Sequence, residues 1–151
     1  MQEHSIRVER TARFFTLGHA GKETKNVWLV FHGYGSLASE FLKNFSHLDN
    51  NENYVIAPEG LSRFYLKGSG GNVGASWMTK ESRVNEIEDY LNYINDVLLH
   101  INNLIDLHQV GLQVLGFSQG VATMMRWADQ SDFAIDNLII WAGTLPPERD
   151  Y

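Results

Sequence analysis

The sequence predicts a single α/β domain, built from a mostly parallel sheet with helices on both faces. Short apolar runs that suit buried strands alternate with longer segments of helical periodicity along the 151 residues. Strands that alternate with helices connect as parallel neighbours, since the helix carries the chain back across the face of the sheet. The sequence contains no internal repeat or linker, and its length suits one domain over residues 1–151.

Apolar runs mark the expected elements. The expected strands are one or two edge strands within 6–18, a fully apolar run at 27–31, a short strand at 54–57, and strands at 110–116 and 138–142. The expected helices are 37–48, 82–105 and 119–129. The helix at 82–105 has the clearest pattern, because its apolar residues recur every three or four positions. The stretch from Glu59 to Gly74 is expected to be irregular.

Composition excludes several classes of function. The chain carries 18 acidic and 12 basic residues, and its net charge of −6 argues against nucleic acid or an anionic membrane as the main partner. It contains no cysteine, which excludes disulfides, cysteine-ligated zinc and a thiol nucleophile. The N-terminus lacks the apolar region of a signal peptide, and no apolar run reaches the roughly 18 residues that span a bilayer. We therefore expect a soluble, cytoplasmic domain without a membrane span.

The most informative segment is 116–120, with the sequence Gly-Phe-Ser-Gln-Gly, between an expected strand and an expected helix. A G-x-S-x-G pentapeptide at a strand-to-helix turn is the nucleophile elbow of α/β-hydrolases, where a strained turn exposes the serine hydroxyl. The flanking glycines allow the strand and the helix to pack closely. Ser118 is therefore the expected nucleophile of an acyl transfer. The alternative is a turn serine without chemistry.

A second glycine-rich motif, His-Gly-Tyr-Gly at 32–35, follows the apolar strand at 27–31. In α/β-hydrolases one oxyanion donor is the backbone N–H of the residue after the nucleophile, which here is Gln119. The other donor comes from a loop that follows a buried strand, and this position falls on Tyr34. The alternative is an ordinary glycine-rich turn, because H-G-x-G alone is a weak motif.

Four motifs in one order and spacing carry a family resemblance. They are His-Gly-Tyr-Gly at 32–35, Ala-Pro-Glu-Gly at 57–60, Gly-Phe-Ser-Gln-Gly at 116–120 and Ala-Gly-Thr-Leu-Pro at 142–146. Together they resemble the small serine carboxylesterases, which include bacterial phospholipase/carboxylesterases and acyl-protein thioesterases. The resemblance covers residues 27–147.

The resemblance implies an α/β-hydrolase fold, no cofactor, and hydrolysis of short to medium acyl esters or thioesters, which are small-molecule substrates. It also implies that Ser118 is the nucleophile and that Gln119 and Tyr34 supply the oxyanion donors. The family usually has leucine where this chain has Tyr34. A backbone donor tolerates that change, but the wall of the pocket would differ.

The base and the acid of a catalytic triad are where this chain departs from the family. In α/β-hydrolases the triad runs serine, then acid, then histidine, but all six histidines of this chain precede Ser118. We therefore expect the C-terminal strands and helices of the fold, with the triad acid and base, to be missing from this chain. His32 is interpreted as a residue that binds its own loop. Glu148 and Asp150 follow the last expected strand, and neither is assigned as the acid.

Three aromatic residues, Phe64, Tyr65 and Trp77, are candidates for lining an acyl pocket, and core packing explains them equally well. The glycine-rich stretch 68–71 lacks the Lys-Ser/Thr continuation of a phosphate-binding loop, so no nucleotide cofactor is expected. No pair of histidines has metal-ligand spacing, and no metal site is expected.

Two hypotheses of function follow. The first is a serine hydrolase that cleaves carboxylic esters or thioesters. The second is a truncated or degenerate hydrolase that acts as a non-catalytic binding or interaction module. In either case the strand at 138–142 would lack its next parallel neighbour, which predicts self-association through this strand edge.

Overall fold

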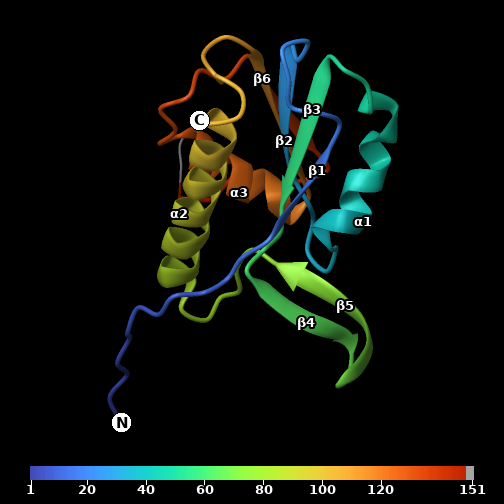
Figure 1. Cartoon of the computed structure of the whole chain (residues 1–151). Coiled ribbons are helices and arrows are strands. Elements are labelled where there is room, and N and C mark those ends of the chain that lie inside the picture. The colour runs from blue at the N-terminus through green and yellow to red at the C-terminus, as the bar shows by residue number, and fades with distance from the viewer. Residues whose placement is uncertain (149–151) are drawn as a thin grey trace.

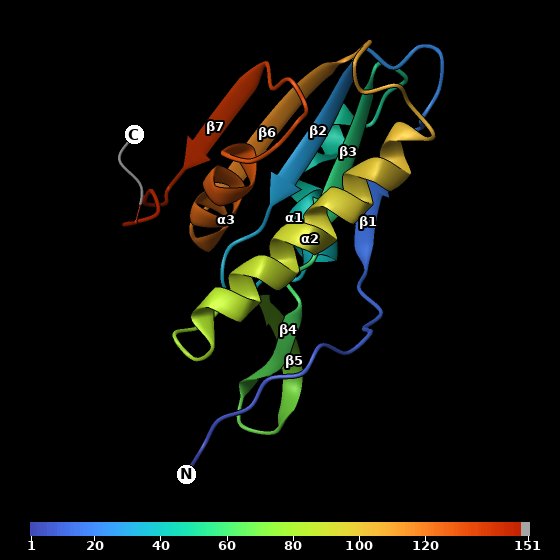
Figure 2. The same ribbon diagram turned by 90° about the vertical axis from the view of Figure 1, so that its left-hand side faces the viewer.

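The computed structural model describes residues 1–148 and contains a five-stranded sheet with the order β1-β3-β2-β6-β7 (Figures 1 and 2). Its strands are β1 (Phe14–Leu17), β2 (Asn26–Phe31), β3 (Asn53–Pro58), β6 (Gly111–Phe117) and β7 (Asn137–Trp141). β1 runs antiparallel to β3, and the pairs β3–β2, β2–β6 and β6–β7 are all parallel. The expected mostly parallel sheet is therefore confirmed.

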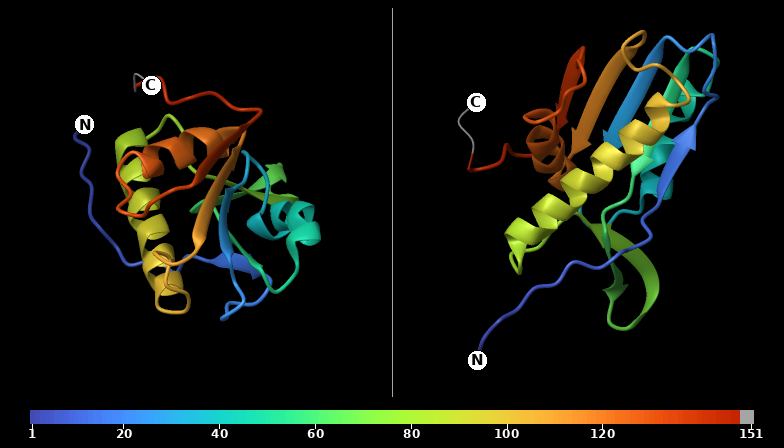
Figure 3. Two further views of the ribbon diagram at one scale, coloured as in Figure 1. Left: turned by 90° about the horizontal axis from the view of Figure 1, so that it is seen from above. Right: turned by 60° about the vertical axis from the view of Figure 1, so that its left-hand side comes forward.

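Helices cover both faces of this sheet. They are α1 (Ala38–Leu42), the 3₁₀ helix η1 (Lys43–Leu48), α2 (Arg83–Asn102) and α3 (Gln119–Ala128). α1 packs on one face, against β1 and β3, whereas α2 and α3 lie on the other (Figures 1 and 3). Among residues 1–148, no helix is both long and apolar enough to cross a membrane.

Alternate residues of the inner strands divide the core into two layers. In β2, Leu29 and Phe31 point toward α2 and α3, and Val30 points toward α1. All three side chains are fully buried. The continuous apolar run of β2 therefore arises because this strand has a helix on each side.

The stretch after β3 is regular, and the expectation of an irregular segment from Glu59 to Gly74 is wrong. It forms an antiparallel hairpin of β4 (Ser62–Lys67) and β5 (Gly70–Ser76), which projects from the end of the main sheet (Figure 1). Gly68, with a φ of 56°, lies in its turn, and Gly71, with a φ of 85°, lies at the start of β5. The glycine-rich part of this stretch is thus the turn of the hairpin and the first residues of β5.

Two smaller differences from expectation concern the first elements. Within 6–18 there is one edge strand, β1, and the residues before it form no described helix or strand. The single helix expected at 37–48 divides into α1 and the 3₁₀ helix η1. Phe41 and Phe45 nevertheless remain buried together, as the spacing of one helix face predicts.

Candidate active site

Ser118 lies at the turn from β6 to α3 in a backbone conformation that few residues adopt. Its φ is 53° and its ψ is −116°, a region that costs about 1–3 kcal/mol for a residue with a side chain. Neighbouring bonds hold this turn: the Ser118 N–H donates to the carbonyl of Trp141 at 2.9 Å, and the Val121 N–H donates to that of Ser118 at 3.0 Å. Strain at a half-buried serine between a strand and a helix is typical of a nucleophile elbow.

Three glycines allow the close packing around Ser118. A Cβ at Gly116 would lie 2.7 Å from the carbonyl oxygen of Gly120 and from the Cα of Val121. A Cβ at Gly120 would lie 2.3 Å from the carbonyl oxygen of Phe31, and one at Gly143 would lie 2.4 Å from that of Ser118. The glycines of the pentapeptide are therefore required by backbone contacts between α3, β6 and β2.

The loop after β2, residues 32–36, lies directly against the elbow and is termed the oxyanion loop below, after the role that the sequence predicts for it. A Cβ at Gly33 would be 3.3 Å from the Cβ of Ser118. The far side of the loop is bonded to β5: the Gly35 N–H donates to the carbonyl of Ala75 at 2.9 Å, and the Ala75 N–H donates to that of Ser36 at 3.3 Å. The structure thus brings the loop that carries Tyr34 to the same end of the sheet as Ser118 and Gln119.

The side chain of Gln119 holds the start of α3 against the segment that follows β5. Its Oε1 accepts from the backbone N–H of Trp77 at 3.1 Å, and its Nε2 donates to the carbonyl of Met78 at 2.9 Å. This amide therefore has a positional role of its own, separate from the oxyanion role predicted for the Gln119 backbone. The sequence motif gives no indication of it.

Both ring nitrogens of His32 are engaged by backbone groups close to the loop. Its Nδ1 lies 2.8 Å from the carbonyl oxygen of Gly33, and its Nε2 accepts from the backbone N–H of Gly60 at 2.9 Å. Burial lowers the pKa of this imidazole, which keeps it neutral and able to accept from Gly60. His32 is thus committed to the loop, as expected, and cannot remove the proton of Ser118 without breaking these bonds.

The three aromatic candidates lie in different places. Trp77 is only 1% exposed and packs in the core beneath the oxyanion loop, where its indole stacks on His32 and donates to the His32 carbonyl at 2.9 Å. Phe64 contacts the ring of Tyr34, with centroids 5.1 Å apart. Tyr65 is the next residue of β4, so it points to the opposite face of the hairpin.

These positions show which of the three aromatic residues lie beside the loop. Trp77 is a core residue, because its indole fills the space between the loop and α2. Tyr65 is exposed but is directed away from Tyr34 and Phe64. Leu66, which sequence reasoning missed, faces the loop, since its Cδ2 would lie 3.3 Å from a Cβ at Gly35. The apolar surface beside the loop is therefore formed by Tyr34, Phe64 and Leu66.

Glu148 is occupied by an ion-pair network on the helical face. Its carboxylate binds the Nε of Arg126 at 2.5 Å and the guanidinium of Arg83 at 2.9 Å, and Arg126 also donates to the hydroxyl of Tyr90. The Arg126 bond lowers the pKa of Glu148 to about 2. Glu148 is thus a structural carboxylate, consistent with leaving it unassigned as an acid. Asp150 lies outside the described residues.

A cavity of about 790 Å³ lies away from this elbow. It is formed between the N-terminal segment and α2, and its walls include Arg10, Phe14 and Asp89. Neither Ser118 nor Tyr34 lines it. Within residues 1–148, no group of three or more histidine, aspartate or glutamate side chains is arranged to hold a metal ion.

The mostly parallel sheet, the strained serine between β6 and α3, and the glycine-rich loop after β2 are together typical of the α/β-hydrolase fold. Solved structures share this fold. A phospholipase/carboxylesterase from Dyadobacter fermentans aligns with a TM-score of 0.67 and 17% identity, over 92% of this chain and 63% of its own. An acyl-protein thioesterase 2 from Zea mays aligns with a TM-score of 0.55 and 18% identity, over 91% of this chain and 64% of its own.

A carboxylesterase from Bacillus cereus aligns with a TM-score of 0.59 and 10% identity, over 91% of this chain. The chain spans 63% of the length of that protein, so this comparison too leaves more than a third of the solved structure without a counterpart here. Neither a protein-family model nor a curated protein matches the chain significantly. At sequence identities of 10–18%, the structural similarity to these proteins establishes the fold alone.

Proposed function

We propose that this protein is a serine hydrolase that cleaves carboxylic esters or thioesters through an acyl-enzyme on Ser118. The observation that carries the proposal is the strained conformation of Ser118 at the β6–α3 turn, with the backbone of Gly33 packed against it. A strained nucleophile beside a glycine-rich loop is what acyl transfer requires of this fold. The solved esterases and the thioesterase of the same fold support this proposal.

In the proposed reaction, the Oγ of Ser118 attacks the acyl carbonyl carbon while a base accepts the hydroxyl proton. The carbonyl oxygen becomes an oxyanion, and the backbone N–H groups of Tyr34 and Gln119 stabilise it. Collapse of this intermediate expels the alcohol or thiol, which takes the proton from the base. Water then attacks the acyl-enzyme by the same route, releasing the acid and regenerating Ser118.

His32, the histidine of the loop beside Ser118, is not assigned as the base of this reaction. No histidine follows Ser118 in the chain, and both ring nitrogens of His32 are bonded to their own loop. The exposed Tyr34 and the neighbouring Phe64 and Leu66 would contact the acyl group, which suits an apolar acyl chain. The second candidate is a non-catalytic binding module on the same fold, and the bonds that hold both ring nitrogens of His32 in their own loop favour it.

Phosphonylation of Ser118 separates the two candidates. We expect a fluorophosphonate to form an adduct on Ser118, roughly 10²-fold faster than on the equally half-buried Ser131, since preorganised oxyanion donors typically contribute at least this factor. Peptide mass mapping locates the adduct, and added imidazole supplies the base and should increase the rate. Ser118→Ala is the control. Labelling of Ser118 no faster than of Ser131 would leave only the binding module.

We also propose that two copies of the chain associate through the edges of β7. This strand pairs with β6 and with no other strand of residues 1–148. It contains no charged residue or proline, and Leu138, Ile140 and Trp141 are exposed on its two faces. Because natural edge strands usually carry charges, prolines or bulges that block pairing, an unprotected edge favours antiparallel pairing with its own copy about a two-fold axis.

Sedimentation of two lysine variants tests this association. We expect the parent chain to show concentration-dependent dimers or larger species, and Ile140→Lys to remain a monomer because a lysine on the edge disfavours pairing. Leu99→Lys on α2 is the matched control, because Leu99 is 57% exposed and Ile140 is 50% exposed. The proposal would be contradicted by a parent chain that is monomeric at every concentration. It would also be contradicted if Ile140→Lys and Leu99→Lys reduced the fraction of dimer equally.

A further inference from the structure

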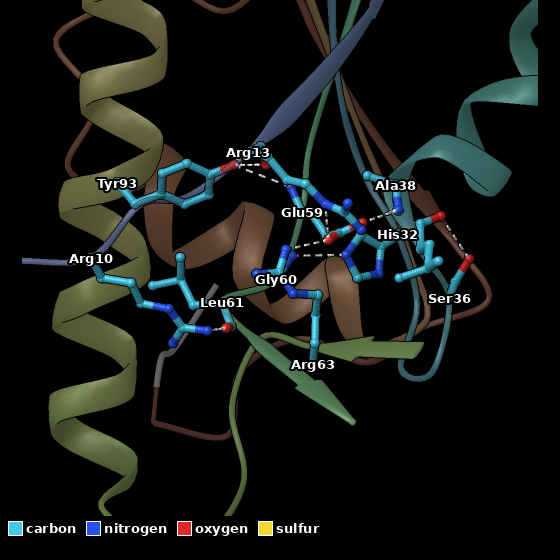
Figure 4. Close-up of polar contacts among 11 residues, drawn as sticks. Arg10, Arg13, His32, Ser36, Ala38, Glu59, Gly60, Leu61, Arg63 and Tyr93 are labelled. Carbon is cyan, nitrogen blue, oxygen red and sulfur yellow. Dashed lines mark hydrogen bonds and ion pairs between the residues drawn. The ribbon is translucent and has the colours of Figure 1, made fainter. Parts of the chain in front are cut away.

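Glu59 is a buried carboxylate placed between the N-terminal segment, the hairpin and α1. Its side chain is 1% exposed. Oε1 binds the Nε of Arg13 at 2.7 Å and a guanidinium nitrogen of Arg63 at 3.3 Å, and Oε2 accepts from the backbone N–H of Ala38 at 3.2 Å (Figure 4). The two carboxylate oxygens therefore have different partners, cations on one side and the first N–H of α1 on the other.

Ala38 is two residues beyond the oxyanion loop, so this bond fixes the point at which the loop enters α1. The other end of the loop is held by the adjacent residue, because the Gly60 N–H donates to Nε2 of His32 (Figure 4). The pair Glu59 and Gly60 thus holds both ends of the loop. The N-cap residue of α1, Leu37, makes no side-chain hydrogen bond to the helix, so the Glu59 carboxylate takes the place of a capping side chain.

We infer that Glu59 is a positioning residue: its carboxylate fixes the start of α1 and thereby holds the oxyanion loop, and the Tyr34 N–H, against Ser118. The functional part of this inference rests on the proposed hydrolase activity. Arg13 and Arg63 are each partly exposed and compensate the charge of the buried carboxylate. They also connect the oxyanion loop to the N-terminal segment and to β4.

Glu59→Gln is an informative substitution, because the glutamine side chain has nearly the same size as that of glutamate and changes only its hydrogen-bonding groups. A glutamine has one acceptor oxygen and one NH₂ donor group. If its oxygen faces the two arginines, its NH₂ meets the N–H of Ala38. If the oxygen accepts from Ala38, the NH₂ meets the arginines. Neither orientation satisfies both sides, so the bond that fixes α1 is lost or the arginines lose their partner.

Hydrogen exchange tests the positional role independently of catalysis. In Glu59→Gln we expect the amides of Gly35, Ser36 and Ala38 to exchange at least 10-fold faster, with the amides of β2 and β6 unchanged. Glu52→Gln is the matched control, because Glu52 pairs with Lys25 at the surface and should leave the loop unchanged. Unchanged loop exchange, or an equal increase throughout the sheet, would overturn the inference.

The rate of Ser118 phosphonylation supplies the functional readout. We expect it to fall at least 10-fold in Glu59→Gln, and Glu59→Asp, which keeps both acceptor oxygens, to recover part of the rate and of the loop protection. If Glu59→Gln does not fold, Glu59→Asp alone tests the inference. Its loop amides should then exchange faster than those of the parent chain, while the amides of β2 and β6 stay unchanged. If the parent Ser118 is not phosphonylated, the proposed function fails, while the exchange result still decides the role of Glu59.

Discussion

Gly120→Ala is expected to reduce the free energy of unfolding by more than about 3 kcal/mol, or to prevent folding. The added Cβ would lie 2.3 Å from the carbonyl oxygen of Phe31 and 2.7 Å from that of His32. Both oxygens belong to backbone at the end of β2, which is held between β3 and β6 and cannot move away. The gain in helix propensity, about 1 kcal/mol, is smaller than this clash.

Gly21→Ala is the control for this prediction. Gly21 also lacks a positive φ, and no atom lies within 4 Å of a Cβ placed there. Its free energy of unfolding should stay within about 1 kcal/mol of the parent value. Urea denaturation followed by circular dichroism measures both variants. Similar stabilities for Gly120→Ala and the parent would show that α3 can shift away from β2, and the close packing of the elbow would not be required.

Trp77→Ala is expected to destabilise the protein by about 3–5 kcal/mol, the usual cost of truncating a buried aromatic side chain. The indole is 1% exposed, and it packs edge-on against Phe31 at a centroid distance of 5.5 Å. Its removal also leaves the buried carbonyl of His32 without the Nε1–H donor, which adds to the cost. The oxyanion loop should loosen together with the core.

Trp141→Ala is the matched control, because this tryptophan is 52% exposed on β7. The comparison is made at a protein concentration at which the parent chain is a monomer, so that association through β7 does not contribute. We expect it to change the free energy of unfolding by about 1 kcal/mol or less. Trp77→Phe should fall between the two, since it keeps the ring but not the donor to His32. Equal losses of stability for Trp77→Ala and Trp141→Ala in urea titrations would contradict the core position assigned to Trp77.

Local patterns in the sequence were sufficient for the main elements. The apolar run that becomes β2 and the helical spacing that becomes α2 are properties of neighbouring residues, so they can be read without the fold. The Gly-Phe-Ser-Gln-Gly pentapeptide likewise predicts its own turn, because a Cβ at Gly116 would meet Gly120 and Val121 of the adjacent helix. The contact of Gly120 with the end of β2 is tertiary, and the motif does not reveal it.

The hairpin after β3 is the clearest error of sequence reasoning. Phe64 and Leu66 alternate with polar or exposed neighbours as a strand requires, but the segment is short and rich in glycine. Its stability comes from pairing between β4 and β5 and from the bonds of Gly35 and Ser36 with Ala75. Gly35 and Ser36 are about 40 residues away from Ala75 in the sequence, so the local pattern does not reveal these bonds.

By itself, the sequence determined the α/β alternation, the elbow at Ser118 and the absence of any histidine after it, because each depends on residues close together in the chain or on their order. Only the tertiary structure decided that Trp77 is core, that Tyr65 faces away from Tyr34, and that Glu59 joins Arg13, Arg63 and Ala38. The physical reason is that burial and pairing depend on which distant segments meet.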